Sequence, residues 1–406
     1  MPRSTVAVAE RNRDEDEAVP RDRSEAPEAL ETWWRSARGP SRETRGLSGL
    51  RGAAALLVVL SHASRDGFYL APGLDFEGTG KLGVWLFFSL TAFLLTGQMI
   101  EAGAPLRAPN LWRFFLRRAF RILPLFVSAL ALDVALGRIE ASRFLPAVTM
   151  QHAPHIFWTV PPEFQYYACI PVVAALFVAW DRRLLPAAAL TLVVTIASVW
   201  LVPASPVVWP YLGVFVLGSF TALLAPRVRP SAWLGALAFG CVLAIAQAAP
   251  AVMSVTGLDS RFDPNVLRNT PAPFGLLWAP VLLAAIHAPS WRGVLGSRPL
   301  VWLGEISFAL YLLHPLALTA VESLGLSGSL GFCASVLLSV AFAAAAFRLI
   351  ERPARELGYR LTSPSPIGSR FLEPSSRPEL PDPLPMRLRP EVGIARLPGE
   401  EGSDSK

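Results

Sequence analysis

Long apolar runs alternate with short polar connections between residues 47 and 350 of the chain. An α-helix needs about 20 apolar residues to cross a bilayer, and ten runs reach or nearly reach that length. The pattern predicts an all-α, polytopic membrane protein with about ten transmembrane helices. The expected spans are 47–63, 80–101, 118–137, 163–180, 184–202, 207–225, 231–253, 272–288, 299–320 and 327–349.

The two ends of the chain do not follow this pattern. Residues 1–44 mix acids and arginines without apolar periodicity, and residues 358–406 are rich in proline and charge. Segments of this composition bury too little apolar surface to fold. We expect two disordered tails on either side of a membrane domain at 45–357. The first apolar run has no small-residue cleavage site, so a signal peptide is not expected.

The distribution of charge predicts an orientation for the spans. Only 17% of residues are charged, against about 25% in soluble domains. Eleven arginines fall in the connections that an inside N-terminus places on the inner side, against six basic residues in the outer connections. Inner connections of membrane proteins are enriched in this way. We therefore expect both tails in the cytoplasm, and the net charge of +6 reflects topology and a bilayer partner, not nucleic acid.

The cysteines and loop histidines carry no metal-binding or disulfide signal. All three cysteines lie inside apolar runs without CxxC spacing. His152 and His155 have no cysteine or acidic cluster at ligand spacing beside them. We expect neither a metal site nor a permanently bound cofactor.

The first apolar run carries an arginine and a histidine on one helical face. Arg51 and His62 are eleven residues apart, close to three turns, so they lie on one stripe about 16 Å apart along the axis. Ionisable groups at such depth normally face the protein interior or a water-filled cavity. Taken alone, Arg51 would be an anchor at the inner boundary and His62 a hydrogen-bonding residue at the outer interface.

Other stretches of the sequence indicate what these two residues do. The run "LSGLRGAAALLVVLSH" (47–62) resembles the opening motif of the membrane acyltransferase-3 family, an arginine followed after ten residues by a histidine. The later motifs of the family are similar, in order and spacing, to "LGVWLFFSLTAFLLTG" (82–97), "RFFLRRAFRILP" (113–124), "FWTVPPEFQYY" (157–167), "LGEISFALYLLHPL" (303–316) and "ERPAR" (351–355). Ser48, Thr91–Ala92 and Val160–Pro161–Pro162 depart from the usual residues.

The resemblance implies a reaction and a location. Members of this family have ten transmembrane helices and transfer acyl groups, most often acetyl, from a coenzyme A thioester to a hydroxyl group. The acceptors are sugars of surface polysaccharides, glycolipids or glycosylated metabolites. The resemblance thus implies an O-acyltransferase of the bacterial cytoplasmic membrane with acetyl-CoA as co-substrate. The acceptor, the acyl chain length and the oligomeric state are left open.

The resemblance also implies roles for individual residues. Guanidinium groups bind phosphates through paired donors, so Arg51, Arg118 and Arg121, with Arg117, are expected to bind the phosphates of coenzyme A. His62 is expected to act as the general base or to carry the acyl group itself. The remaining candidates are Glu163, which orients an imidazole or holds the acceptor, and the substrate-binding residues Trp158, Tyr166, Tyr167, Tyr311 and His314.

The same residues also allow simpler interpretations, and the sequence also fits other functions. The arginines also fit a positive-inside cluster, and Glu163 with its aromatic neighbours also fits a membrane-interface belt. Ten helices with ionisable residues near the midplane also fit a transporter. Against a transporter, the sequence shows no internal repeat between its two halves and no paired broken helices. A third possibility is a non-catalytic membrane scaffold whose tails are interaction arms.

Overall fold

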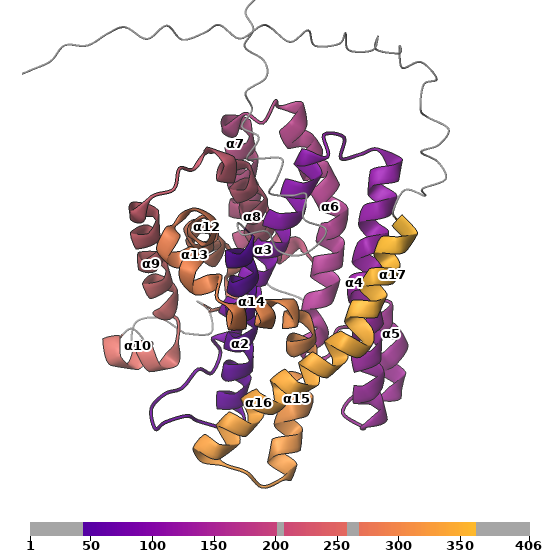
Figure 1. The fold of residues 1–406 in the computed structure, drawn as a ribbon, viewed down its shortest axis with the longest axis vertical. Coiled ribbons are helices and arrows are strands. Elements are labelled where there is room, and N and C mark those ends of the chain that lie inside the picture. The colour runs from indigo at the N-terminus through magenta and orange to yellow at the C-terminus, as the bar shows by residue number, and fades with distance from the viewer. Residues whose placement is uncertain (1–43, 201–206, 258–267, 363–406) are drawn as a thin grey trace, which may run out of the picture. The chain divides into compact units, whose positions relative to one another are not determined.

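The computed structural model describes residues 44–200, 207–257 and 268–362, and this part of the chain is helical without strands (Figure 1). The predicted tails lie almost entirely outside these ranges, so their disorder stays a prediction. At the C-terminal end, α17 (Arg352–Thr362) runs past the predicted domain boundary at residue 357. The reason is tertiary packing, because Gly358 and Thr362 are buried.

Five helical segments of the described chain are long and apolar enough to cross a membrane. Two further pairs pass the same test together, but they are sharply bent: α12–α13 by 88° and α14–α15 by 78°. The described residues thus hold five to seven spans by length and composition, and the count of about ten and the orientation stay predictions. The five segments are α2 (Arg45–Arg65), α3 (Gly80–Glu101), His155–Ala179 with η2 (His155–Thr159) and α6 (Val160–Ala179), Trp209–Arg227 with η3 (Trp209–Tyr211), α8 (Leu212–Leu224) and η4 (Ala225–Arg227), and Gly328–Thr362 with α16 (Gly328–Ala346), η5 (Phe347–Glu351) and α17.

The remaining helices are shorter, bent or charged. Their bounds are α4 (Ala108–Ala135), η1 (Ala141–Arg143), α5 (Phe144–Val148), α7 (Leu184–Val199), α9 (Ala232–Ala246), α10 (Pro250–Thr256), α12 (Pro271–His287), α13 (Pro289–Leu295), α14 (Arg298–Glu305) and α15 (Ser307–Ser323).

Two of the predicted spans are interrupted. The range 231–253 is divided into α9 and α10, because Pro250 has no backbone N–H to continue a helix and instead begins the next one. The range 299–320 is divided at Ile306 into α14 and α15, and the Ser307 hydroxyl donates a hydrogen bond to the carbonyl of Gly304 at this corner. The two helices together still pass the length and composition test for one span, although Glu305 lies at the corner, so the hydropathy pattern predicts a single helix here.

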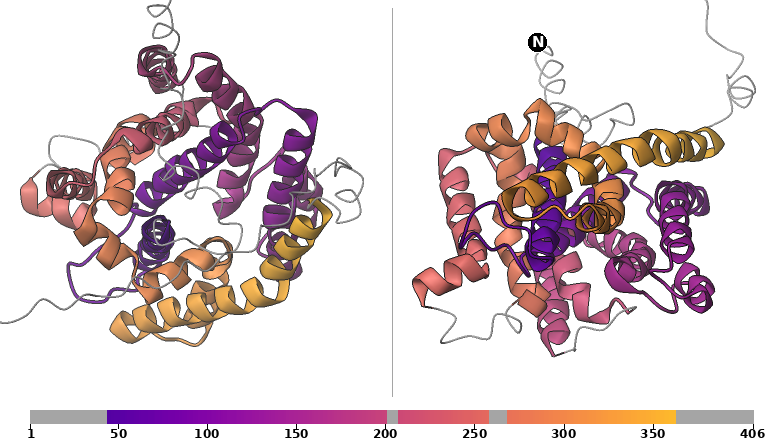
Figure 2. Two further views of the ribbon diagram at one scale, coloured as in Figure 1. Left: turned by 45° about the horizontal axis from the view of Figure 1, so that its top comes forward. Right: turned by 90° about the horizontal axis from the view of Figure 1, so that it is seen from below.

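Helix α2 lies inside the bundle and packs against α3, α12, α13, α14, α15 and α16 (Figures 1 and 2). Its glycines allow the close approach. A Cβ atom at Gly46, Gly49 or Gly52 would overlap a backbone carbonyl oxygen of a neighbouring helix. Small residues at helix contacts let backbones approach closely in membranes. The glycine face thereby fixes the position of Arg51 and His62 on the same helix.

We expect Gly49→Ala to lower the free energy of unfolding by about 1–3 kcal/mol, the usual cost of overpacking. The new methyl group would displace the carbonyl of Leu295. Thermal unfolding of the purified protein measures this, with Gly240→Ala as the matched control. Gly240 is also helical, but nothing lies within 4 Å of the place that its new methyl group would occupy. Equal midpoints for the two variants would contradict the close packing of α2.

Helix α4 begins ten residues before the span predicted at 118–137, because its first turns pair with α17 (Figure 1). Arg117 donates a hydrogen bond through Nε to Thr362 Oγ1 at 2.7 Å, and its guanidinium lies 5.1 Å from the centre of the Tyr359 ring. Gly358 lies against Phe120, with no space for a side chain. The pairing brings the arginines of α4 and α17 together.

Candidate active site

A cavity of about 680 Å³ lies between α2, α3, α4, α6, the α14–α15 corner and α17. Most of the sequence-predicted polar residues converge on it from helices that are distant in sequence. The predicted residues that line the cavity are Arg51, Arg118, Arg121, Glu163, Tyr167 and Tyr311.

Five arginines give one part of this cavity a positive charge. Arg51 comes from α2 and Arg118 and Arg121 from one face of α4. The other two, Arg352 and Arg355 of α17, were not among the predicted site residues, although both lie in the ERPAR motif. Three glutamates, of which Glu163 is one, also line the cavity, which leaves a formal excess of two positive charges.

Two buried groups, one in the arginine cluster and one beside it, influence which ligands the cavity can bind. Nε of Arg118 is buried and has no hydrogen-bond partner, so it remains available for an anion. Glu351, in the single π-helical turn η5, is 1% exposed and lies 3.6 Å from Arg355. Arg51 and Arg121 also act on it electrostatically. Glu351 thus offsets part of the repulsion that would otherwise separate the arginines.

Glu163 lines the same cavity from the first turn of α6. Its Oε1 accepts hydrogen bonds from the Tyr167 hydroxyl at 2.6 Å and from Thr91 Oγ1 at 3.1 Å. Thr91 is in the middle of α3, whereas Glu163 is in the first turn of α6. The start of α6 is therefore level with the middle of α3, not at the end of a span as the hydropathy pattern indicated. Thr91, a departure from the family motif, supplies one of the two donors.

Tyr311 joins the cavity to a second polar site. Its hydroxyl donates to the carbonyl of Ile156 at 2.7 Å, while its ring lines the cavity. One turn further along α15, the ring of His314 lies 6.1 Å from that of Tyr311, between ring centres. His314 is fully buried.

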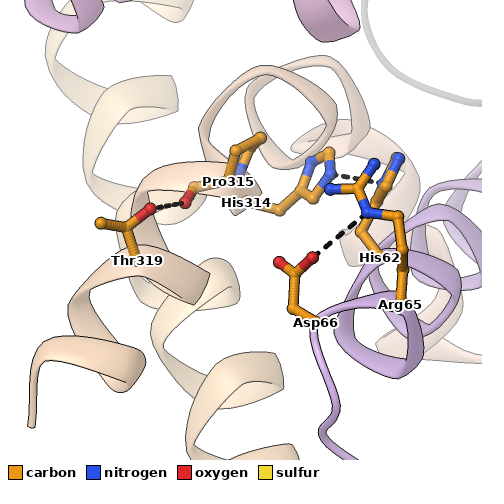
Figure 3. A network of polar contacts seen from close by, with 6 residues as sticks. All are labelled: His62, Arg65, Asp66, His314, Pro315 and Thr319. Atoms are coloured by element: carbon orange, nitrogen blue, oxygen red, sulfur yellow. Dashed lines mark hydrogen bonds and ion pairs between the residues drawn. The ribbon is translucent and has the colours of Figure 1, made fainter. Parts of the chain in front are cut away.

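His62 and His314 form a pair at the other end of α2 (Figure 3). Nδ1 of His62 lies 2.9 Å from Nε2 of His314, and the ring centres are 4.8 Å apart. Neither histidine lines the cavity described above. The predicted stripe of Arg51 and His62 therefore has its arginine in the cavity and its histidine beyond Tyr311.

Besides the two histidines, three further predicted site residues lie outside the cavity lining. Tyr166 is fully buried, hydrogen-bonded to Ser219 Oγ at 2.7 Å and stacked on Phe215. Trp158 packs in an aromatic cluster with Trp85 and neighbouring rings. Arg117 faces α17, as described above. Their predicted roles in binding stay predictions.

Comparison with known proteins shows the family to which the chain is related. The family model described as "Acyltransferase domain", that of the acyltransferase-3 family, matches residues 44–348. The chain is 26% identical over 369 residues to "Putative peptidoglycan O-acetyltransferase YrhL" of Bacillus subtilis (strain 168), covering 78% of this chain and 55% of that protein. It is also 26% identical over 310 residues to "Exopolysaccharide production protein ExoZ" of Rhizobium meliloti (strain 1021), covering 68% of this chain and 89% of that protein.

The chain thus spans about half the length of the Bacillus relative and most of the length of the Rhizobium relative. No solved structure matches. The matched range contains Arg51, Arg118, Arg121, Glu163 and both histidines of the pair. The chain belongs to the acyltransferase-3 family of membrane acyltransferases.

Proposed function

We propose that the protein is an O-acyltransferase of the bacterial cytoplasmic membrane, which transfers an acyl group, acetyl in the first instance, from acyl-CoA to a sugar hydroxyl. The observation that carries the proposal is the cavity with five arginines, which adjoins the His62–His314 pair through Tyr311. The names of the two relatives refer to peptidoglycan O-acetylation and exopolysaccharide production, and both favour a glycan acceptor.

The arginines supply the binding energy for the donor. Coenzyme A carries its phosphates at one end and its thioester at the other, and guanidinium groups bind phosphate through paired, charge-assisted hydrogen bonds. The predicted orientation opens the arginine cluster to the cytoplasm, where acyl-CoA is dissolved. The pantetheine arm then extends past Tyr311 toward His62, over the distance of about 16 Å that separates Arg51 from His62 along α2.

His62 removes the proton from the acceptor hydroxyl. The alcohol oxygen attacks the thioester carbonyl carbon, the carbon–sulfur bond breaks, and the proton passes from His62 to the departing thiolate. The products are an O-acyl ester and free coenzyme A. In the second route, His62 itself takes the acyl group and passes it to the alcohol. Glu163 holds the acceptor or the thioester end of the donor through its remaining carboxylate oxygen.

Transfer of label from acetyl-CoA tests the proposal. The full chain is reconstituted into liposomes with labelled acetyl-CoA outside and peptidoglycan fragments or extracellular polysaccharide as acceptor probes. We expect base-labile label on the glycan and stoichiometric release of free thiol. Accumulation of intact acetyl-CoA inside the liposomes without thioester cleavage would indicate a transporter and contradict the proposal. Family membership disfavours that alternative.

A further inference from the structure

The hydrogen bonds of His314 determine where its proton lies. Nδ1 of His314 is 2.7 Å from the carbonyl oxygen of Tyr311 and 3.3 Å from that of Leu310. A carbonyl oxygen only accepts hydrogen bonds, so Nδ1 must carry the hydrogen. In the neutral imidazole, Nε2 of His314 is then left with its lone pair and can only accept.

The acceptor on His314 in turn determines the proton position on His62. Nδ1 of His62 lies 2.9 Å from that Nε2 atom and must therefore donate to it. The bare nitrogen of neutral His62 is then Nε2, the atom that remains outside the pair. When His62 gains a proton at Nε2, both hydrogen bonds persist unchanged. This is the behaviour needed in a general base that is charged and discharged in each cycle.

The opposite arrangement, with a cationic His314, is disfavoured. His314 is fully buried, and a buried cation is costly without a partner of opposite charge. The charged groups that act on the pair are Arg65 and Asp66, at the end of α2. These two residues form an ion pair with each other at 3.2 Å (Figure 3). The Asp66 carboxylate therefore already has a cationic partner other than an imidazole.

The sequence explains why the Tyr311 carbonyl is available. In an α-helix, this carbonyl would accept from the backbone N–H of the residue four positions later. That residue is Pro315, which has no N–H. The side chain of His314 donates to this free carbonyl, and the His–Pro pair in "LYLLHP" thereby fixes both the ring orientation and the tautomer of His314.

We propose that His314 is a positioning residue that holds His62 in the tautomer with a bare Nε2, and that Nε2 is the atom that receives the proton of the acceptor hydroxyl. The inference rests on the proposed function for its second part. Its first part, the proton position on His62, can be measured without any activity.

Nitrogen NMR of the full chain in nanodiscs, with isotope-labelled histidine, tests the first part. The chain has five histidines, so single substitutions assign the signals. Above the titration range of His62, we expect its hydrogen on Nδ1 in the wild type. In His314→Leu, which keeps the apolar packing but removes the acceptor, we expect a mixture of tautomers. A wild-type His62 with its hydrogen on Nε2 would overturn the inference.

Activity of two His314 variants tests the second part. In His314→Gln, the amide oxygen can accept the hydrogen bond from His62 that Nε2 of His314 accepts in the wild type. In His314→Leu, the side chain has no acceptor. We expect His314→Leu to lower kcat by about 10- to 100-fold, a part of the contribution of a general base, and His314→Gln to retain most of it. KM for acetyl-CoA should change in neither. His287→Leu is the control, because His287 also bonds a carbonyl but lies at the α12–α13 bend.

The outcomes are distinguishable from failure of the proposed function. If the His314→Leu variant retains as much activity as the His314→Gln variant, His314 does not act through the tautomer of His62, and the inference is overturned. If the wild type transfers no acyl group at all, the proposed function fails, and the NMR result alone decides the proton position. Pro315→Ala gives a second variant, because it restores an N–H that competes with His314 for the Tyr311 carbonyl and should weaken the fixed tautomer.

Discussion

The His62→Ala variant is expected to lose acyl transfer by at least about 100-fold, with KM for acetyl-CoA changed much less. A general base contributes about 10²–10⁴-fold to a rate, and an acyl carrier contributes at least as much. Arg51 is three turns away from His62 on α2, and the other arginines of the cavity are on α4 and α17, so donor binding through these arginines should survive. Rates of glycan labelling and thiol release, in the same reconstituted system, measure both quantities.

The two routes for His62 differ in what happens without an acceptor. If His62 carries the acyl group, wild-type protein retains label from acetyl-CoA and the alanine variant does not. If His62 is a base, neither protein retains label. His152→Ala is the matched control, because His152 is exposed and does not line the cavity. A folded His62→Ala variant with near wild-type transfer would remove His62 from the mechanism.

The Arg121→Gln variant is expected to raise KM for acetyl-CoA by about 10- to 100-fold. Hydrogen bonds to charged groups contribute about 1.5–3 kcal/mol, and each 1.4 kcal/mol is a factor of ten. Arg121 repels Arg51, Arg118 and Arg355 across the cavity. Its neutralisation relieves this repulsion but also removes an attraction to the buried Glu351, so thermal unfolding of the variant is measured beside KM to separate donor affinity from folding.

A truncated donor gives this prediction its control. Acetyl-pantetheine has the thioester but no nucleotide phosphates, so wild type and Arg121→Gln should use it equally poorly. Arg113→Gln is the matched variant, because Arg113 is on the same helix but does not line the cavity. If Arg121→Gln raises KM for acetyl-CoA and KM for acetyl-pantetheine by the same factor, Arg121 does not bind phosphate.

Positions along single helices were predictable from the sequence, because helix periodicity is a local property. The three-residue spacing of Arg118 and Arg121 predicts one face of α4, and both line the cavity. The family and the all-helical character were likewise correctly predicted from motifs and apolar runs. These features depend on residues within a few turns of each other.

Contacts between distant helices were not predictable in the same way. Arg352 and Arg355 join the cavity because α17 pairs with α4, more than 200 residues earlier in the sequence. The His62–His314 contact depends on how α15 leaves the corner at Ile306. Its one sequence signal is Pro315 after a histidine, which frees a carbonyl one turn back. An apolar run contains no information on which neighbour its polar residues meet.

The helical segment Gly328–Thr362 has 35 residues, a length of about 52 Å. The hydrocarbon layer is about 30 Å thick, so even a tilted segment extends well beyond it at one end. The end that carries Arg352 and Arg355 is clamped to α4 through Gly358 and Arg117. A thicker or thinner bilayer should then change the tilt of α16 and leave the spacing between these arginines and those of α4 unaltered, so donor affinity is expected to be insensitive to lipid chain length.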